Sequence, residues 1–381
     1  MLIPRLIVAR PVFAWRTSSR PTLVRTRLAW DDARLRRATS IRSTAGGSLT
    51  LGYAGLPEGA SHVVPFMEER AAHGAPVHRR TRTVPWTDAM EPSGVDLMTI
   101  GAPAERIRSL ASAHDLLLPF RIELVVPVVP DVAAMRARVS RKERQRVARQ
   151  RRDLGWALEN ATAAADFEWF YENVHLPTMR RRHGLATRSL EREIAFQCVF
   201  RQGFLFFLTE GRERIAGMLC LFSPRTRTLT LRLAGVTHGA QAHYGTSAFA
   251  GLYVLILEWA ATHGIRAVNL SGCEPFLSKG IFQFKRKLHP RVVRPADHFG
   301  AKRLWLRVVR DTPAVRDFLV ANPVIAETPG GALEAVYFHD DQRPARRDIR
   351  WEGTGLSAAR MTHLDSFLQA TSNGGPSFVS A

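Results

Sequence analysis

The stretch "NLSGCEPFLSKGIFQFKRKLH" (Asn269–His289) decides the fold, because it joins the end of a buried strand to a segment rich in aromatic and basic residues. The preceding letters "IRAVNLSG" are typical of a buried strand, and Gly272 interrupts the apolar run. Glu274 is the first carboxylate after this strand. An extended chain then places two sets of side chains on opposite sides: Phe282, Phe284 and Arg286 on one, and Gln283, Lys285 and Lys287 on the other.

Upstream of this stretch, the sequence predicts a β meander followed by a long helix. Three apolar runs, Phe204–Thr209, Ile215–Phe222 and Thr228–Leu233, are separated by turn residues and indicate antiparallel strands. The apolar helix expected over Ser247–His263 ends at Gly264, a residue typical of helix C-termini. The order helix, strand, helix, meander, helix, strand therefore leads directly into the opening stretch.

A basic helix precedes the meander. Met135–Leu154 contains no Gly or Pro and predicts one helix, in which nine of the seventeen residues from Arg136 to Arg152 are basic and one is acidic. One interpretation is a solvated helix face. The other is a helix that contacts phosphates, because like charges four residues apart disfavour a helix unless a partner neutralises them. A helix over Ala165–Arg182, kinked at Pro177, follows.

The composition limits the possible partners and compartments. Lys and Arg number 54 against 34 Asp and Glu, and the net charge of +20 predicts either attraction to polyanions or simply a soluble basic surface. Cys198, Cys220 and Cys273 lack metal-ligand spacing, so we expect reduced thiols in a cytoplasmic protein and no metal site. The longest apolar run, Phe249–Leu257, is too short to cross a bilayer, which needs about 20 residues, and no transmembrane anchor is expected.

The length of 381 residues predicts two or three domains, in an α/β (α+β) protein. Prolines interrupt the arginine-rich start of the chain, and the last forty residues are polar. The expected organisation is a poorly ordered basic leader (1–45), a chemically quiet α/β half (46–130), a catalytic domain (131–300), a helix over Ala301–Val320 with a strand packing back (301–340), and a largely disordered polar tail (341–381).

Four features in this order carry a resemblance to a known superfamily: "SRKERQRVARQRRDLGW", "YENVHLPTMRRRHG", the meander with Gly217, and the opening stretch that closes in Phe-Lys. Over residues 133–289 the chain resembles the Gcn5-related N-acyltransferase (GNAT) superfamily, in its branch of CelD-like acyltransferases and Fem-type peptidoglycan interpeptide-bridge transferases. The resemblance implies a mixed twisted sheet whose central parallel strands splay apart, so that an acyl donor meets an amine between them. Relatives often carry two such domains in tandem, which would make 46–130 a degenerate first one.

The resemblance also implies a donor-binding loop before the long helix. The family pattern is Gln or Arg, two residues, Gly, one residue, and Gly or Ala, whereas "GAQAHYGTSA" places its glycine one residue later. Backbone N–H groups at a helix N-terminus can still hold phosphate. The candidate donor-binding residues are Gln241, His243, Gly245, Thr246 and Ser247. The implied donors are acetyl-CoA or another acyl-CoA, an acyl carrier protein, or, as in Fem-type relatives, an aminoacyl-tRNA.

Transfer to an amine needs a deprotonated nucleophile, and removing the proton at pH 7 costs about 4 to 5 kcal/mol. Glu274 could act as the general base, or it could stabilise its own turn before Pro275. Cys273 is an alternative covalent nucleophile. Tyr244 or His243 could reprotonate the leaving group. The family's Phe-Lys pair implies that Lys285 contacts a phosphate or carbonyl of the ligand.

The acceptor side is defined less sharply. Lys279, Arg182 and His183 are candidate substrate-binding residues, although a cation at a helix C-terminus also has a structural role. Three functions stay open: N-acyl transfer to a small-molecule or cell-envelope amine, Fem-type transfer from aminoacyl-tRNA to a cell-wall or peptide amine, and non-catalytic nucleic-acid binding through the Arg136–Arg152 helix.

Overall fold

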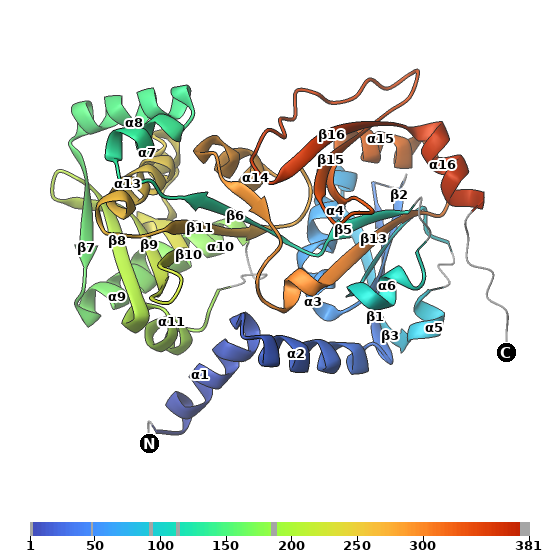
Figure 1. Cartoon of the computed structure of the whole chain (residues 1–381), viewed down its shortest axis with the longest axis horizontal. Coiled ribbons are helices and arrows are strands. Elements are labelled where there is room, and N and C mark those ends of the chain that lie inside the picture. The colour runs from blue at the N-terminus through green and yellow to red at the C-terminus, as the bar shows by residue number, and fades with distance from the viewer. Residues whose placement is uncertain (1–2, 47–48, 91–93, 112–114, 184–188, 374–381) are drawn as a thin grey trace. The chain divides into compact units, whose positions relative to one another are not determined.

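The computed structural model describes residues 3–46, 49–90, 94–111, 115–183 and 189–373, and the chain folds into two compact units (Figure 1). Unit 1 comprises Met1–Thr17, Glu123–Ser271 and Phe284–Arg291. Unit 2 comprises Ser18–Ile122, Gly272–Gln283 and Val292–Ala381. The units therefore alternate along the sequence. Both are built from helices and mixed sheets, which confirms the predicted α/β class.

The sheet of unit 1 has seven strands, and three of these strands each include one or two residues that belong to unit 2. The strand order is β12 (Arg291–Val293), β6 (Ile122–Pro127), β11 (Ala267–Cys273), β10 (Thr228–Val236), β9 (Glu213–Ser223), β8 (Gly203–Glu210) and β7 (Trp156–Ala161). Strands β7 to β10 are antiparallel neighbours, and the segment β8–β9–β10 is the predicted meander. Strands β10 and β11 are parallel.

The parallel pair β10–β11 separates soon after it begins. Only Thr228–Thr230 pairs with Ala267–Asn269, although the two strands continue to Val236 and Cys273. A bulge between Leu231 and Leu233 marks the end of this pairing on β10. The predicted divergence of the central strands is thus confirmed.

Unit 1 contains more helices than the sequence predicted, because some predicted helices are divided into shorter ones. They are α1 (Ile3–Thr17), α7 (Val132–Arg138), α8 (Arg141–Leu154), α9 (Ala164–Phe170), a π-helical turn (Tyr171–His175), α10 (Leu176–His183), α11 (Arg192–Cys198), α12 (Gln241–Gly245) and α13 (Ala248–Thr262). The single basic helix predicted over 135–154 is two helices, because Val139 and Ser140 are extended between α7 and α8. Gly264 has φ +63, as its predicted position after a helix C-terminus requires.

The segment after Glu274 is helical, so the predicted extended chain is wrong there. Helix α14 covers Gly280–Lys285 and a 3-10 turn covers Arg286–Leu288, ending at His289 with φ +51. Alternation of aromatic and basic residues over so few positions fits a helix turn as well as a strand, and the helix allows Phe282 to be fully buried.

Unit 2 contains two sheets. The larger has the order β3 (Val77–Pro85), β1 (Arg37–Ala45), β2 (Leu49–Gly55), β4 (Leu97–Pro103), β13 (Lys302–Val308) and β5 (Leu116–Pro119), and the smaller has β14 (Val324–Glu327), β15 (Leu333–His339) and β16 (Leu356–His363). Strands β2 and β4 are parallel. The helices are α2 (Pro21–Arg34), α3 (Pro57–His62), α4 (Val64–Ala72), α5 (Trp86–Ala89), α6 (Ala104–Arg108), α15 (Pro313–Ala321) and α16 (Leu364–Asn373).

Three further expectations differ from the structure. The predicted helix over Ala301–Val320 is strand β13 followed by α15, because Thr312 caps a new helix by accepting from Val315 N at 3.3 Å. The leader expected to be poorly ordered over 1–45 contains α1, α2 and β1. The polar tail from 341 contributes β16 and α16, where Leu356, Leu364 and the ring of Phe367 are buried, so its few apolar residues are sufficient to anchor it.

Strand β3 forms an edge of the larger sheet, and nearly all its residues are exposed. Its register with β1 places Arg80 opposite Arg42 and Arg82 opposite Ser40. Like charges on directly opposite residues destabilise a strand pair. The core of unit 2 instead lies under its other elements, around residues such as Phe120, Phe276 and Leu304.

A buried cluster of charges attaches α2 to the rest of unit 2. The carboxylate of Asp31 is fully buried, and it lies 2.7 Å from Lys302 Nζ and 3.1 Å from Arg27 Nε. Arg27 also contacts Glu58 at 2.5 Å. Burial lowers the pKa of Lys302, while the charge of Asp31 opposes that shift. A buried charge is tolerated only where it is paired, so Lys302 and Arg27 both depend on the carboxylate of Asp31.

We predict that Asp31→Asn destabilises the protein by about 3 to 5 kcal/mol, because it leaves Lys302 and Arg27 buried without the carboxylate. The measurement is urea unfolding. The adjacent Asp32 is a matched control, since its pair with Arg106 joins side chains that are 44% and 37% exposed. Asp32→Asn should cost less than about 1 kcal/mol. Equal losses in the two variants would contradict the structural role of Asp31.

Candidate functional site

The separation of β10 and β11 leaves backbone groups of β10 without a strand partner, and side chains bind them instead. His175 Nδ1 lies 3.2 Å from Ala234 O. The hydroxyl of Thr178 accepts from Val236 N at 2.9 Å and donates to Val236 O at 3.1 Å. The hydroxyl of Ser271, on β11, donates to Leu231 O. The end of β10 is therefore bound by the π-helical turn and α10, while Ser271 links it to β11 at Leu231.

The released groups of β11 are bound in the same way. Ser271 has φ +64, and its N–H donates to Asn269 Oδ1 at 2.9 Å. Its carbonyl accepts from Lys285 Nζ at 3.2 Å. Asn269 Nδ2 in turn donates to Glu123 Oε2 at 2.9 Å. Lys285, predicted to contact the ligand, is only 4% exposed and supports the backbone of one wall of the opening.

The predicted donor loop lies between β10 and α13. It consists of a 3-10 turn (Thr237–Gly239), α12 and Thr246–Ser247. Gln241 and Gly245 are exposed, His243 is half-buried, and Thr246 donates to His243 O at 3.2 Å. Ser247, with φ +66, precedes the first turn of α13 without capping it.

A basic residue from outside the loop reaches its end. Arg146 Nη1, on α8, donates to Ser247 Oγ at 2.9 Å. The same helix is fixed by buried Glu143, whose carboxylate lies 2.9 Å from Lys287 Nζ and 3.5 Å from Arg146 Nη1. A guanidinium beside the N-terminus of α13 adds positive charge where backbone N–H groups are unpaired, which favours an anion.

Two candidate residues, Tyr244 and Arg182, are in contact. The Arg182 guanidinium carbon lies 4.5 Å from the ring centre of Tyr244 and 5.4 Å from that of Phe249. The Tyr244 hydroxyl is buried, and no described residue forms a hydrogen bond with it. Nearby, burial raises the pKa of Tyr253, so its hydroxyl stays protonated. Tyr244 thus offers an unpaired donor beside a cation, an arrangement suited to a ligand oxygen or sulfur.

The remaining predicted residues are distributed differently. Glu274 and Lys279 are part of unit 2, where Lys279 Nζ lies 2.6 Å from Glu274 Oε2 and 4.8 Å from the ring centre of Phe66. Glu274 is 5% exposed, and its carbonyl accepts from Phe276 N. Cys273 is buried as well. The side chain of His183, the last residue of α10, lies outside the described residues.

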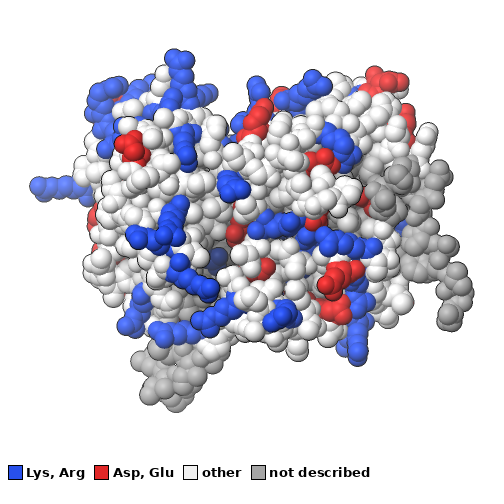
Figure 2. Space-filling view, in the orientation of Figure 1, with Lys and Arg blue, Asp and Glu red and all other residues white. Residues whose placement is uncertain are grey.

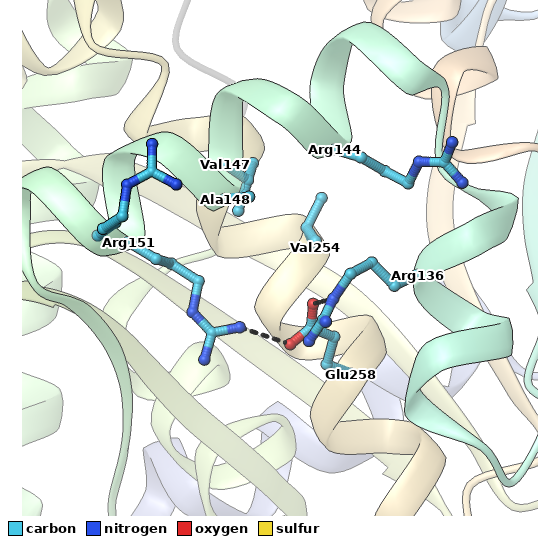
Figure 3. A pocket seen from close by; sticks show the side chains of 8 residues that line it. Arg136, Arg144, Val147, Ala148, Arg151, Val254 and Glu258 are labelled. Carbon is cyan, nitrogen blue, oxygen red and sulfur yellow. Dashed lines mark hydrogen bonds and ion pairs between the residues drawn. The ribbon is translucent and has the colours of Figure 1, made fainter.

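The basic helix lines a cavity that the sequence analysis did not predict. Figure 2 shows exposed Lys and Arg side chains over α7 and α8, and Figure 3 shows the cavity beside these helices. It has a volume of about 410 Å³ and is lined by Arg136, Arg144, Val147, Ala148, Arg151, Arg152, Val254 and Glu258. Glu258 belongs to α13 and lies far from α8 in the sequence. No local sequence pattern therefore predicted that Glu258 lines this cavity together with the arginines of α8.

Two features are absent from the described residues. None of the described helices has the length and apolarity needed to cross a membrane. Over the same described ranges, no group of three or more His, Cys, Asp or Glu side chains is arranged to hold a metal ion.

Comparisons with known proteins give structural neighbours only. Neither a protein-family model nor a curated protein matches the sequence. Solved structures that are similar to the chain include FemX (10% identity, TM-score 0.38, covering 68% of this chain and 81% of that one) and L-PGS from Bacillus licheniformis (12%, 0.36, 79% and 96%). A GCN5-related N-acetyltransferase from Kribbella flavida is also similar (16%, 0.25, 81% and 64%). They include the Fem-type and GNAT proteins that the sequence resembles. Unit 1 itself has the feature that the resemblance implied, a mixed sheet in which the parallel strands β10 and β11 separate after three paired residues.

We predict a pH-dependent loss of stability that depends on His175. Burial lowers the pKa of His175, so below about pH 6.5 the unfolded chain binds a proton that the native imidazole does not. The free energy of unfolding should therefore fall as the pH drops below this value, by up to about 1.4 kcal/mol per pH unit. Denaturant titrations from pH 7 to pH 5 measure this slope.

The variant His175→Gln should show a shallower pH slope, although it is less stable at pH 7 because it loses packing against Phe170 and Tyr171. His289→Asn is the control, because His289 is exposed and Asn tolerates its positive φ. A slope in His175→Gln as steep as in the wild type would contradict the role of His175.

Proposed function

We propose that unit 1 transfers an acyl group from a thioester donor of the acyl-CoA class to a primary amine, by direct attack in the opening between β10 and β11. The observation that carries the proposal is the pairing of only Thr228–Thr230 with Ala267–Asn269, beyond which side chains bind the released backbone groups. An opening stabilised in this way is available to a ligand without unfolding the sheet. The acceptor is an amine of a small molecule or of the cell envelope, and the protein acts in the cytoplasm.

The energetics favour a mechanism based on positioning. Deprotonating a lysine-like amine at pH 7 costs about 4 to 5 kcal/mol. Holding amine and carbonyl in contact contributes about 7 to 11 kcal/mol, which is larger than that cost. The walls of the opening, fixed by Thr178 and Lys285, supply the required rigidity.

The donor's phosphates bind at the loop before α13. The N–H groups of the first turn of α13, together with Arg146 and Ser247, form the anion-binding end. Gln241, His243, Gly245 and Thr246 complete the loop around it. The Tyr244 hydroxyl, held beside Arg182, donates its proton to the leaving thiolate, and Arg182 stabilises the negative charge.

Glu274 is the proposed base because it directly follows the last residue of β11. Its carboxylate, directly or through water, accepts the proton of the attacking amine. Lys279 holds this carboxylate in place at 2.6 Å. His183, at the end of α10, belongs to the acceptor side of the proposal.

A second candidate keeps the reaction but changes the donor to an aminoacyl-tRNA. The one-sign charge of α7 and α8, where nine of the seventeen residues from Arg136 to Arg152 are basic, favours this donor. An acyl carrier protein, which is acidic as a class, would also be attracted to this surface. Non-catalytic nucleic-acid binding is the third outcome, in which affinity falls steeply with salt but no acyl group is transferred.

A melting-shift screen of the full chain tests these alternatives against acetyl-CoA, longer acyl-CoAs, acylated carrier protein and aminoacyl-tRNA. A donor at 100 times its Kd stabilises the native state by about 2.7 kcal/mol. Each donor that binds is then incubated with amine acceptors and the acylated amine is detected by mass spectrometry. Binding without transfer to any amine would contradict the enzymatic proposal.

We predict that Tyr244→Phe lowers kcat by about 100-fold or more, because it removes the proton donor but keeps the ring against Arg182. The melting temperature should not change, since the hydroxyl has no partner among the described residues. Steady-state kinetics provide the measurement. Unchanged kcat would remove Tyr244 from the mechanism.

For Glu274 we predict that Glu274→Gln lowers kcat by about 100-fold or more. Lys279→Met provides the comparison, because it breaks the same ion pair and leaves the carboxylate in place. If Glu274 only stabilises its turn, the two variants should lose similar melting temperature and similar activity. A loss of kcat specific to Glu274→Gln identifies the base.

A further inference from the structure

The cavity beside α8 is distinct from the loop that precedes α13. Four arginines and one carboxylate line it, which leaves a net charge of three positive at its walls. Its volume of about 410 Å³ lies within the range of small-molecule sites, about 300 to 1,000 Å³. Such a concentration of like charge on adjacent helices is unfavourable unless an anion neutralises it.

Glu258 holds two of these arginines in fixed positions. Arg136 Nε donates to Glu258 Oε1 at 2.7 Å, and Arg151 Nη1 donates to Glu258 Oε2 at 2.9 Å (Figure 3). The carboxylate is only 11% exposed. Each guanidinium has five N–H donors in a rigid fork, so one bond to Glu258 leaves most of the fork for a ligand. The contact with Glu258 thus fixes the positions of Arg136 and Arg151 and leaves most of their N–H groups available to a ligand.

Part of the cavity wall is apolar. Val147 and Ala148 on α8 and Val254 on α13 contribute no charge or hydrogen-bonding side-chain atoms. An apolar wall beside guanidinium groups suits a ligand that carries a flat ring next to a phosphate, because arginine forms bidentate bonds with phosphate and also stacks on rings.

The cavity and the donor loop lie along the same helix. Val254 and Glu258 follow Ser247 by about 10 Å and about 16 Å along α13, at about 1.5 Å per residue. Helix α8 contacts both places, since it sends Arg146 to Ser247 and lines the cavity with Arg144 and Arg151. A single extended ligand with separated phosphates can therefore reach from one to the other.

We propose that this arginine cavity binds a nucleotide phosphate at the end of the donor remote from the acyl group. The inference rests on the proposed function and names a second contact site for the same donor. The shared chemistry is a nucleoside phosphate. It has two sources, the 3′-phosphorylated adenosine of coenzyme A or a nucleotide of an RNA carrier.

The test compares equal losses of charge on one helix. The double variant Arg144→Gln/Arg152→Gln removes two cavity arginines that do not bind Glu258. Arg141→Gln/Arg149→Gln is the matched control, with two arginines of α8 that do not line the cavity. Ala148→Trp fills the cavity from an exposed position without changing its charge.

The first probes are coenzyme A, dephospho-coenzyme A and adenosine 3′,5′-bisphosphate, with Kd measured by calorimetry on the full chain. We expect wild type and the control to bind coenzyme A at least 10-fold more tightly than dephospho-coenzyme A. The cavity double variant and Ala148→Trp should lose this preference and the binding of the bisphosphate. If the source is RNA, tRNA affinity should fall in these two variants, and the slope of log Kd against log salt should decrease by about 1 to 2 in the double variant.

Failure of the inference and failure of the proposed function are distinguishable. Identical affinities for every probe in wild type, cavity variants and control would overturn the cavity site, while acyl transfer by the wild type would leave the proposed function intact. Conversely, bisphosphate binding that depends on Arg144 and Arg152, in a protein that transfers no acyl group, would support the cavity and overturn the reaction.

Discussion

A peptide group that leaves a sheet must find another hydrogen-bond partner, and unit 1 is organised around this requirement. Once β10 and β11 separate, Ala234, Val236 and Ser271 carry backbone groups that no neighbouring strand binds. An unpaired buried carbonyl or amide costs about 1 to 3 kcal/mol. Because side chains of α10, its π-helical turn and α14 satisfy them, the separated state is the stable one.

The same contacts connect the opening to its surroundings. Helix α10 binds Val236 through Thr178. The same helix carries Arg182 near its C-terminal end, so this contact also fixes the guanidinium that lies over the ring of Tyr244. The π-helical turn brings His175 to Ala234 and to Ser189, with Nε2 2.6 Å from the serine hydroxyl. Extra residues in a helix turn of this kind redirect side chains locally. One element therefore both supports the strand and orients the candidate site.

Periodicity was sufficient to predict the meander and α13, because both are long and punctuated by turns or by Gly264. It failed at α14, where six residues cannot distinguish a helix from a strand, and at β13, whose five consecutive buried residues lack the alternation of a half-exposed strand. The separation of β10 from β11 was predicted from the resemblance to a superfamily and not from the periodicity of the sequence. The ion pairs of Glu258 with Arg136 and Arg151 depend on tertiary packing, which no local signal encodes.

The edge strand β3 has a consequence for the behaviour of the protein at high concentration. A free edge exposes amide and carbonyl groups that could recruit a strand from another molecule, which is a common route to fibrils. Arg80 and Arg82, beside Arg42 on β1, would be brought against their own copies in such a contact. Mutual repulsion of these arginines disfavours intermolecular strand addition, so the local instability of this edge protects the protein from self-association into fibres.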